Sequence, residues 1–560
     1  MVLRASNNGL SMNIIETIQE TFATFLHKTF DLPKTEVQNY TFELNVEEAK
    51  QQFGDLTSNA ALILAKNLKR NPREIAQKIA DSFKNEYLRD IGVAGAGFVN
   101  AFLTDKALQK LSQELFEEKE TFFKTGQDLK KQNYNIEFIS ANPTGPFHFG
   151  HGRGGIIGDV LGNILKFLGQ DVTKEFYVND AGSQIQKLGT SFKIRIQQQL
   201  GQDVELPEDA YHGKYLIELA KECIGEYGKE VLDKPDEFFS DYAKEKMLAM
   251  QKETLKMYGI HFDIWFSEKS LHESSVIEHA VEILQKNGYV YEDDGALWFT
   301  STKFGDDKDR VIRKTDGNWT YLAPDIAYMV NKVERGFNHL VMTLGHDHHS
   351  YAVRLEAIRQ ALQIKAPLDV ILYQLVKIKE DGQFMRMSKR AGRMITLRDI
   401  IETVGKDVAR FFYLNRKADA QLEFDVNLAL KKTEENPVYY VQYAYVRTNS
   451  ILNKACDEKK LCDISCKDIS DIGHEESYLL KKIVSLKSLL KTIALNNQTH
   501  LLTYYLIELA TVFHRYYAKH RVIELGNVEQ SRSRLLLIKL LNQTFATCLD
   551  LIGISKPEKM

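Results

Sequence analysis

The sequence predicts an α/β protein in which a central parallel sheet is interrupted by a helical insertion and flanked by two further units. In residues 126–190, apolar strand-like runs alternate with a segment of helical spacing, which is typical of a parallel sheet. Residues 191–305 carry long helical patterns rich in Gln and Lys, and residues 437–560 are helical in pattern almost throughout. A chain of 560 residues is also too long for one hydrophobic core, so several domains are expected.

The composition is that of a soluble globular protein, with 44% hydrophobic and 27% charged residues. No uninterrupted apolar run reaches the length of a membrane span, and no apolar core follows Arg4, as a signal peptide would require. We therefore expect a cytoplasmic protein without membrane contact. Residues 1–11 are expected to be a polar, disordered leader, which makes Met12 a second candidate start.

The cysteines are scattered and odd in number, which suits a reducing cytoplasm. Cys456, Cys462 and Cys466 come closest together, but their spacing lacks the close pairs of a zinc site. We expect free thiols and no structural zinc.

Residues 12–125 are predicted to form a separate α+β unit. Helical spacing and strand-like runs both occur in it, the helices at 14–30, 60–68 and 72–83 and the strands at 40–44 and 94–103. The second helix and the turn after it carry four basic residues, Lys66, Lys69, Arg70 and Arg73. This face is either simply solvated or meets a nucleic acid.

The most informative stretch is residues 136–155, IEFISANPTGPFHFGHGRGG. Residues 134–139 are short, aromatic and β-branched, which predicts a buried strand. Pro143, Gly145 and Pro146 then force a turn, and apolar residues spaced by three and four begin a helix.

His148 and His151 are thus predicted at the start of a helix. Unpaired backbone N–H groups at such a start favour a phosphate, and a histidine adds a donor that is neutral or cationic near pH 7. Gly150 and Gly152 lack side chains, so a flat ligand such as a nucleobase could approach the backbone closely.

The rest of the core is predicted from further strand-like runs. These lie at 172–178, 265–268, within 289–304, at 339–344 and at 370–379, with a turn and a helix start at 318–328. Residues 381–393 follow as a flexible loop, because Gly382 and Gly392 lie near its ends. It carries Arg386, Lys389, Arg390 and Arg393, and such a loop can close cations onto a polyphosphate. Alone, it would be interpreted as a basic surface loop.

Residues 437–560 carry 17 Lys and Arg against 12 Asp and Glu, whereas the whole chain has a net charge of −3. A basic end on an acidic protein is compatible with a phosphate-backbone partner, although most charged faces are simply solvated. Tyrosines crowd two of the helices here, which is typical of a core, and one or two rings could stack on a base.

Residues 141–151, ANPTGPFHFGH, resemble the first signature of class I aminoacyl-tRNA synthetases, and in this longer form that of the arginyl-tRNA synthetases. Residues 384–392, FMRMSKRAG, are similar to the second signature, Lys-Met-Ser-Lys-Ser, with Arg386 for the first lysine and Arg390 for the last serine. An arginine fork differs from a lysine ammonium, so the role of Arg386 is open. Shorter similarities to the arginyl family lie in the N-terminal unit and the tail, at 71–76, 97–100, 436–444 and 555–560.

The resemblance implies a Rossmann-like catalytic core. Residues 12–125 would be an N-terminal domain that contacts the tRNA elbow, and residues 437–560 a helical anticodon-binding domain. The core would comprise residues 126–190 and 306–436, separated by the insertion at 191–305. A monomer is expected.

The resemblance further implies an arginine–tRNA ligase. The carboxylate of arginine attacks the α-phosphate of ATP, and the arginyl group then passes to the 3′ end of tRNA(Arg). Members of the family usually need the tRNA for the first step. Mg²⁺ would accompany the ATP, held mainly by its phosphates and without dedicated protein ligands.

The catalytic residues implied are His148 and His151 at the α-phosphate and Lys389 at the leaving pyrophosphate. The ATP-binding residues implied are Pro143, Gly145, His148, Gly150, His151, Gly152, Met387, Ser388, Lys389 and Arg390. The arginine-binding residues implied are Glu137, Ser140, Asn142, Tyr321, Asp325 and His348.

A guanidinium needs carboxylates at fixed geometry, and two acids are well placed for this. Glu137 lies on the strand before the first signature, and Asp325 follows Tyr321 by four residues at a helix start. Asp325 could instead cap that helix, and Glu137 could be a paired structural charge.

Two other classes of protein remain open. An enzyme that forms the adenylate of another small acid without tRNA would not need the basic helical tail. A nicotinamide enzyme would use Gly150, Gly152 and Gly155, with Asp171 on the ribose. That fold, however, places its first glycine directly after the strand.

Overall fold

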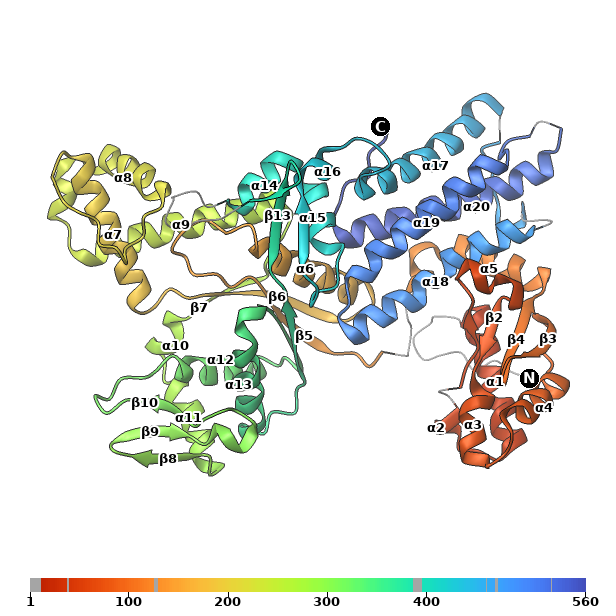
Figure 1. Ribbon diagram of the computed structural model, residues 1–560, viewed down its shortest axis with the longest axis horizontal. Coiled ribbons are helices and arrows are strands. Elements are labelled where there is room, and N and C mark those ends of the chain that lie inside the picture. The colour runs from red at the N-terminus through yellow and green to blue at the C-terminus, as the bar shows by residue number, and fades with distance from the viewer. Residues whose placement is uncertain are drawn as a thin grey trace.

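The computed structural model describes residues 12–37, 40–124, 129–385, 395–459, 461–468, 472–524 and 526–560, and a five-stranded sheet lies at its centre (Figure 1). The strand order is β12 (Leu368–Tyr373), β11 (His339–Gly345), β5 (Asn133–Glu137), β6 (Asp171–Val178) and β7 (Ile264–Ser267). All four neighbouring pairs are parallel, which confirms the predicted α/β class. The order reverses between β5 and β11, where folds of this kind form a ligand crevice at the carboxyl ends of the strands. The predicted leader 1–11 and the loop residues Met387, Ser388, Lys389 and Arg390 lie outside the described residues.

Helices interrupt the sheet between β6 and β7. These are α7 (Ser183–Gln199), α8 (Lys214–Tyr227), η3 (Lys229–Asp233) and α9 (Asp236–Tyr258). They share a separate apolar core, which includes Phe192, Phe239 and Met247. The predicted helical insertion is therefore present, and Figure 1 shows it projecting from the sheet.

A second subsidiary core lies beyond β7. A small antiparallel sheet packs there with helices, and the strands are β8 (Val290–Asp293), β9 (Ala296–Phe299) and β10 (Arg310–Arg313). The helices are α10 (Lys269–Glu273), α11 (Val276–Lys286), η4 (Ser301–Phe304), α12 (Leu322–Glu334), η5 (His346–His348) and α13 (His349–Ala361).

The single strand predicted at 370–379 is wrong. Two strands occupy this stretch, because the Gln374 N–H bonds to the carbonyl of Ala418 (2.8 Å) and draws the chain out of the central sheet. The second strand, β13 (Val376–Glu380), pairs with β14 (Gln383–Phe384) and β15 (Leu422–Asp425). The helices that follow are α14 (Leu397–Val404), α15 (Lys406–Leu414) and α16 (Val426–Leu430).

The N-terminal unit is α+β, as predicted. Its elements are α1 (Ile14–Phe30), α2 (Lys34–Val37), β1 (Glu43–Leu44), η1 (Glu48–Phe53), β2 (Leu56–Ser58), α3 (Ala60–Leu68), α4 (Pro72–Ser82), β3 (Leu88–Ala94), β4 (Phe98–Leu103), α5 (Asp105–Glu118) and η2 (Lys119–Phe123). The strand predicted at 94–103 is instead part of a hairpin of β3 and β4. Gly95 and Gly97, at φ 55° and 144°, turn the chain there.

The C-terminal unit is all-α, as predicted. It consists of α17 (Pro437–Lys459), η7 (Cys466–Asp468), α18 (His474–Asn496), α19 (His500–Lys519) and α20 (Val528–Ile552). Figure 1 shows the N-terminal unit beside these helices, and a buried ion pair joins Lys481 of α18 to Asp55. By length and composition α20 alone among the described helices could cross a membrane, but 72% of its apolar window is buried inside the protein.

The prediction of free thiols is wrong for two of the cysteines. Cys456 and Cys462 form a disulfide with their Cα atoms 4.4 Å apart. The contact arises because the Leu461 N–H bonds to the carbonyl of Ala455 (3.0 Å) and folds the chain back at the end of α17. The three other cysteines are free, namely Cys223, Cys466 and Cys548.

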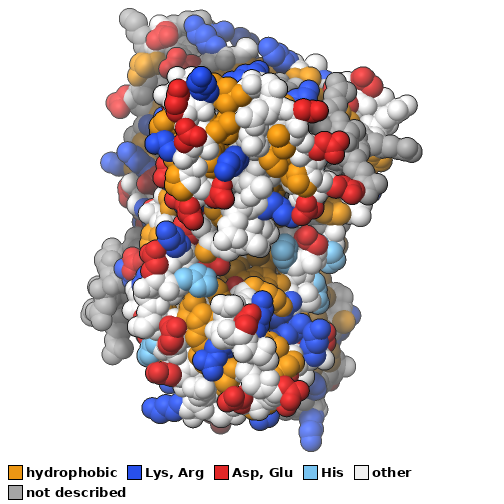
Figure 2. Space-filling view, turned by 90° about the vertical axis from the view of Figure 1, so that its left-hand side faces the viewer, with side chains coloured by type: hydrophobic (Ala, Val, Ile, Leu, Met, Phe, Trp, Pro, Cys, Tyr) orange, Lys and Arg blue, Asp and Glu red, His pale blue; other side chains and the backbone are white. Residues whose placement is uncertain are grey.

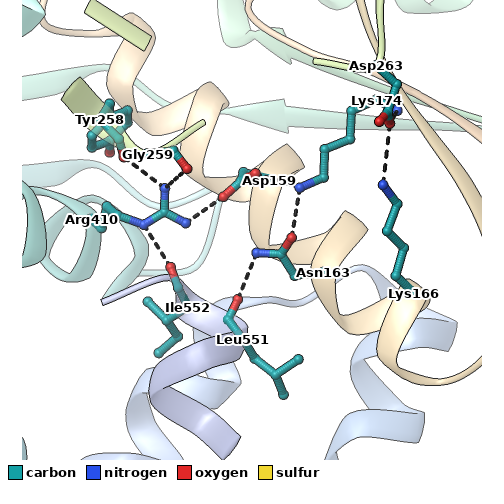
Figure 3. Close-up of polar contacts among 10 residues, drawn as sticks. All are labelled: Asp159, Asn163, Lys166, Lys174, Tyr258, Gly259, Asp263, Arg410, Leu551 and Ile552. Carbon is teal, nitrogen blue, oxygen red and sulfur yellow. Dashed lines mark hydrogen bonds and ion pairs between the residues drawn. The ribbon is translucent and has the colours of Figure 1, made fainter. Parts of the chain in front are cut away.

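One buried cation joins four elements behind the central sheet (Figure 3). Arg410 of α15 is fully buried, and its guanidinium pairs with Asp159 of α6 (His151–Phe167). It also donates to the carbonyls of Tyr258 (3.0 Å) and Ile552 (2.8 Å), at the ends of α9 and α20. Asp159 accepts a further hydrogen bond from Lys174 of β6 (2.6 Å). Buried charges thus fix α6 to the insertion and to the last helix.

Candidate active site

The first signature forms the turn between β5 and α6. Past the end of β5, Ile139 and Ser140 adopt φ angles of 67° and 40°, which are rare for residues with side chains and redirect the chain. The Ser140 hydroxyl accepts from the N–H of Tyr177 (3.1 Å), and this contact holds the bend against β6. Helix α6 then starts at His151, whose N–H bonds to the carbonyl of His148 (2.9 Å).

The two signature histidines lie next to each other. The ring centroids of His148 and His151 are 6.4 Å apart and the rings are nearly perpendicular, at 88°. Burial and the neighbouring His148 lower the pKa of His151 to about 4, so this imidazole is neutral at pH 7. Its Nδ1 atom is buried and has no hydrogen-bond partner among the described residues. A buried polar atom without a partner is the condition that a bound polar ligand would relieve.

The exit of the cationic loop is attached to this turn. His148 and Thr396 form an antiparallel bridge, the Phe149 N–H bonds to the Ile395 carbonyl (3.2 Å), and the Leu397 N–H bonds to the Phe147 carbonyl (2.9 Å). Lys389 stands seven residues before Thr396. The segment that follows the loop is therefore fixed to the histidine turn.

The structure explains the glycines at positions 152 and 154 by packing, which the sequence did not suggest. A Cβ atom on Gly152 would lie 2.8 Å from both Leu397 and Tyr413, and one on Gly154 would lie 2.6 Å from Tyr373. Close packing of α6 against Leu397 and Tyr413 therefore requires that Gly152 carry no side chain.

A cavity of about 40 Å³ lies between the central sheet and helices α12 and α13, and Glu137 at the end of β5 is part of its wall. Polar side chains on its wall are Glu137, Tyr177, Asp325, Tyr328, Lys332 and Tyr351. The remaining wall is apolar. The two carboxylates predicted to meet a guanidinium thus lie in one cavity. Seen from the side that carries the insertion, the surface is hollowed between an upper and a lower lobe, with hydrophobic and histidine side chains at the hollow (Figure 2).

Each carboxylate of the cavity has a partner of its own. The Lys332 ammonium donates to Glu137 (2.6 Å), and both side chains are buried, so the pairing anticipated as an alternative for Glu137 is present. The Tyr351 hydroxyl donates to Asp325 (2.8 Å). The N-cap of α12 is Tyr321, so Asp325 does not cap the helix. Burial, together with the nearby charges of Glu268 and Glu137, raises the pKa of Asp325 to about 7.

Glu268 belongs to this site and was missed in the sequence. It directly follows β7, and burial raises the pKa of its carboxyl group while a hydrogen bond from Tyr177 opposes this. The hydrogen bond joins it to Tyr177 of the cavity wall, and its charge contributes to the raised pKa of Asp325. The only available signal was its position at the carboxyl end of a short strand-like run.

The other predicted arginine contacts lie around the cavity. The side-chain amide of Asn142, in the turn, donates to the side-chain oxygen Oε1 of Gln184 on α7 (2.8 Å). Tyr321 is 66% exposed and does not line the cavity, and Arg354 stacks over its ring at 5.7 Å. His348 is exposed, with its ring 6.3 Å from that of Tyr351. These two residues therefore lie at the rim.

Family models for three domains match most of the chain. The family model for the catalytic domain of class I (R) tRNA synthetases matches residues 110–429. The arginyl tRNA synthetase N-terminal domain matches residues 16–103, and the DALR anticodon binding domain matches residues 441–560. The fold and these matches therefore define a class I aminoacyl-tRNA synthetase.

Full-length relatives narrow the assignment. An arginine–tRNA ligase of Bacillus licheniformis is 39% identical over 98% of this chain and 100% of its own length, and one of Caldanaerobacter subterraneus is 40% identical with the same coverage. The chain belongs to the arginyl-tRNA synthetase family. The arginyl-tRNA synthetase structures of Thermus thermophilus (20% identity, TM-score 0.74) and Plasmodium falciparum (17%, 0.77) each cover 98% of this chain and 100% of their own, and share its fold.

Proposed function

We propose that this protein is an arginine–tRNA ligase, which activates L-arginine with ATP and transfers it to the 3′ end of tRNA(Arg). The observation that carries the proposal is a carboxylate-lined cavity whose wall includes Glu137, at the end of the strand that leads into the histidine turn. A cationic side chain held in the cavity leaves its own carboxylate near His148 and His151. An amino acid with a guanidinium is therefore presented to a phosphate-binding helix start.

The cavity residues would divide the recognition of arginine between them. Asp325, Glu137 and Glu268 would face the guanidinium, while Ser140 and Asn142 would hold the α-amino and carboxylate end. A cavity of about 40 Å³ holds only a few water molecules, so arginine has to widen it on binding. Tyr321 and His348, at the rim, would contact the amino acid only after such a change.

The chemistry then needs positioning and charge stabilisation rather than a general base. An oxygen of the arginine carboxylate attacks the α-phosphorus, a new carboxyl–phosphate bond forms, and the bond to the β-phosphate oxygen breaks. His148 and the neutral His151 would donate hydrogen bonds to the α-phosphate, and Lys389 would stabilise the leaving pyrophosphate. Pro143, Gly145, Gly150, Gly152, Met387, Ser388 and Arg390 would complete the ATP site. A terminal hydroxyl of the tRNA next attacks the arginyl carbonyl and releases AMP.

Mg²⁺ would enter with ATP. The phosphates of the nucleotide would be its main ligands, because Mg²⁺ is commonly bound through substrate phosphates rather than by a full set of protein ligands. When bound, the ion would neutralise phosphate charge.

The tRNA would contact both outer units. We assign residues 12–125 to the elbow and residues 437–560 to the anticodon. The tail presents Arg447 stacked over the rings of Tyr443 (4.5 Å) and Tyr517 (5.0 Å), a surface on which a base could stack.

An enzyme that forms another adenylate without tRNA is not favoured, because both outer units match domains of the arginyl family. A nicotinamide enzyme is not favoured either, because Gly152 and Gly155 lie within α6 and pack against side chains.

Charging of purified tRNA(Arg) by each of the twenty amino acids, offered singly with ATP, tests the proposal. We expect arginine alone to be attached. Charging with a different amino acid, or activation of arginine without transfer, would overturn it.

A further inference from the structure

The signature turn is held from outside by the helical insertion. The side-chain amide of Gln251, on α9, donates to the carbonyls of Asn142 (3.1 Å) and Gly145 (2.9 Å). From α8, the hydroxyl of Tyr215 donates to the carbonyl of Thr144 (2.6 Å). Three backbone carbonyls of the turn, those of Asn142, Thr144 and Gly145, thus accept hydrogen bonds from the insertion.

The side-chain N–H groups of Gln251 explain why a glutamine occupies this buried position. Gln251 is only 1% exposed, and its Oε1 atom is buried without a partner among the described residues. A buried acceptor without a partner is unfavourable, so packing stability alone does not account for a glutamine here. Tyr215 also approaches closely, since a Cβ on Gly145 would lie 2.8 Å from its hydroxyl oxygen.

Helix α9 contacts the other signature segment as well. Two residues beyond Gln251, Glu253 pairs with Arg398 (3.5 Å) on α14, the helix that follows the cationic loop. Seven residues beyond Gln251, the buried Tyr258 hydroxyl donates to the carbonyl of Gly152 (3.1 Å). One helix of the insertion therefore touches the turn, the start of α6 and the helix after the loop.

We infer that Gln251 is a positioning residue, through which the insertion sets the affinity for arginine and ATP. The inference rests on the proposed function, in which Asn142 meets the amino acid while Pro143 and Gly145 meet ATP. Gln251 lies behind the turn and touches neither substrate. Without its two hydrogen bonds the turn shifts, and both binding surfaces lose their alignment.

The test is the variant Gln251→Met, which keeps the length of the side chain and removes both donors. We expect the KM for arginine and the KM for ATP each to rise about tenfold or more, because a small displacement at a binding surface is costly. The KM for tRNA(Arg) should stay unchanged. Tyr215→Phe, which removes the third hydrogen bond, should act in the same direction with a smaller effect.

The matched control is Gln198→Met. The amide of Gln198 donates to the carbonyl of Val204 (2.7 Å) within the insertion, away from the turn, so both KM values should remain those of the wild type. Active-site titration separates positioning from misfolding, since misfolding lowers the number of active sites and leaves KM unchanged. Wild-type KM values in Gln251→Met, or a loss of kcat matched by lost sites, would overturn the inference. A wild-type protein that does not charge arginine would instead overturn the proposed function, and this inference with it.

Discussion

His148 and Thr396 pair as an antiparallel bridge, although 248 positions separate them in the chain. The bridge is flanked by backbone hydrogen bonds between Phe149 and Ile395 and between Leu397 and Phe147. It therefore attaches the segment after the cationic loop to the turn that carries the histidines. In the proposed function, this attachment would allow two short motifs, far apart in sequence, to serve one triphosphate.

Arginine binding should depend on pH through Asp325. Its carboxyl group has a pKa of about 7 in the protein without ligand, and a guanidinium binds the ionised form. Below pH 7 the carboxyl must lose a proton on binding, so the KM for arginine should rise up to tenfold per pH unit from pH 7 to 6 and be level above about pH 8. Steady-state kinetics across pH 6–8.5 measure this.

Asp325→Asn should raise that KM by about 30-fold or more, because truncating one partner of a buried charged pair typically costs 2 kcal/mol or more, and should abolish its pH dependence. The same variant should be more stable at pH 8. The folded protein holds the proton of Asp325 more tightly than the unfolded chain, so this group costs stability as the pH rises from about 4 to 7. Asp203→Asn, at an exposed position of the insertion, is the control and should change neither quantity.

Removing the buried cation behind the sheet should weaken the whole fold. Arg410→Met leaves Asp159 buried with one cation fewer and frees the carbonyl at the end of α20 (Figure 3). We expect a loss of about 3–5 kcal/mol in the free energy of unfolding, measured by urea denaturation. Lys431→Met breaks an exposed pair with Glu435 and should cost less than about 1 kcal/mol. Equal effects of the two variants would contradict the conclusion that the buried Arg410 stabilises the packing of these helices.

Substitution of a glycine by alanine should destabilise the protein where the glycine is closely packed and not where it faces open space. Gly152→Ala drives a Cβ into Leu397 and Tyr413, so we expect a loss of about 1–3 kcal/mol in stability and lower activity. Gly225→Ala, in α8, meets no atom within 4 Å and should be neutral or stabilise by up to about 1 kcal/mol. Thermal unfolding of both variants, with activity measured alongside, tests this. Normal stability and activity of Gly152→Ala would show that α6 does not need this close packing.

Local signals were sufficient for some elements and not for others. Helix α1 has the predicted bounds because Asn13 and Glu16 form a capping box at its start. The apolar run at 370–379 continues through two strands, and only a contact with Ala418, distant in sequence, reveals the break. The disulfide of Cys456 and Cys462 was missed for a related reason, because it depends on how the chain folds back.

Some residues of the candidate site could likewise be predicted from the sequence, and others could not. Glu137 and Asp325 could be selected because each lies at the end of a recognisable element and the family resemblance points to both. Glu268 and Gln251 are ordinary polar residues in sequence, and only the assembled fold brings them to the crevice and to the turn. Long-range geometry, rather than composition, makes them part of the site.

The most direct test of the account is arginine-dependent exchange of pyrophosphate into ATP, measured with and without tRNA(Arg) for the wild type and for Lys389→Ala. We predict exchange with arginine only when tRNA is present, and a rate about 100- to 1000-fold lower in the variant, as expected for loss of a preorganised charge contact. Lys379→Ala, which removes a paired lysine on β13, should exchange at the wild-type rate. Exchange with another amino acid, or a wild-type rate in Lys389→Ala, would contradict an active site assembled from these two loops.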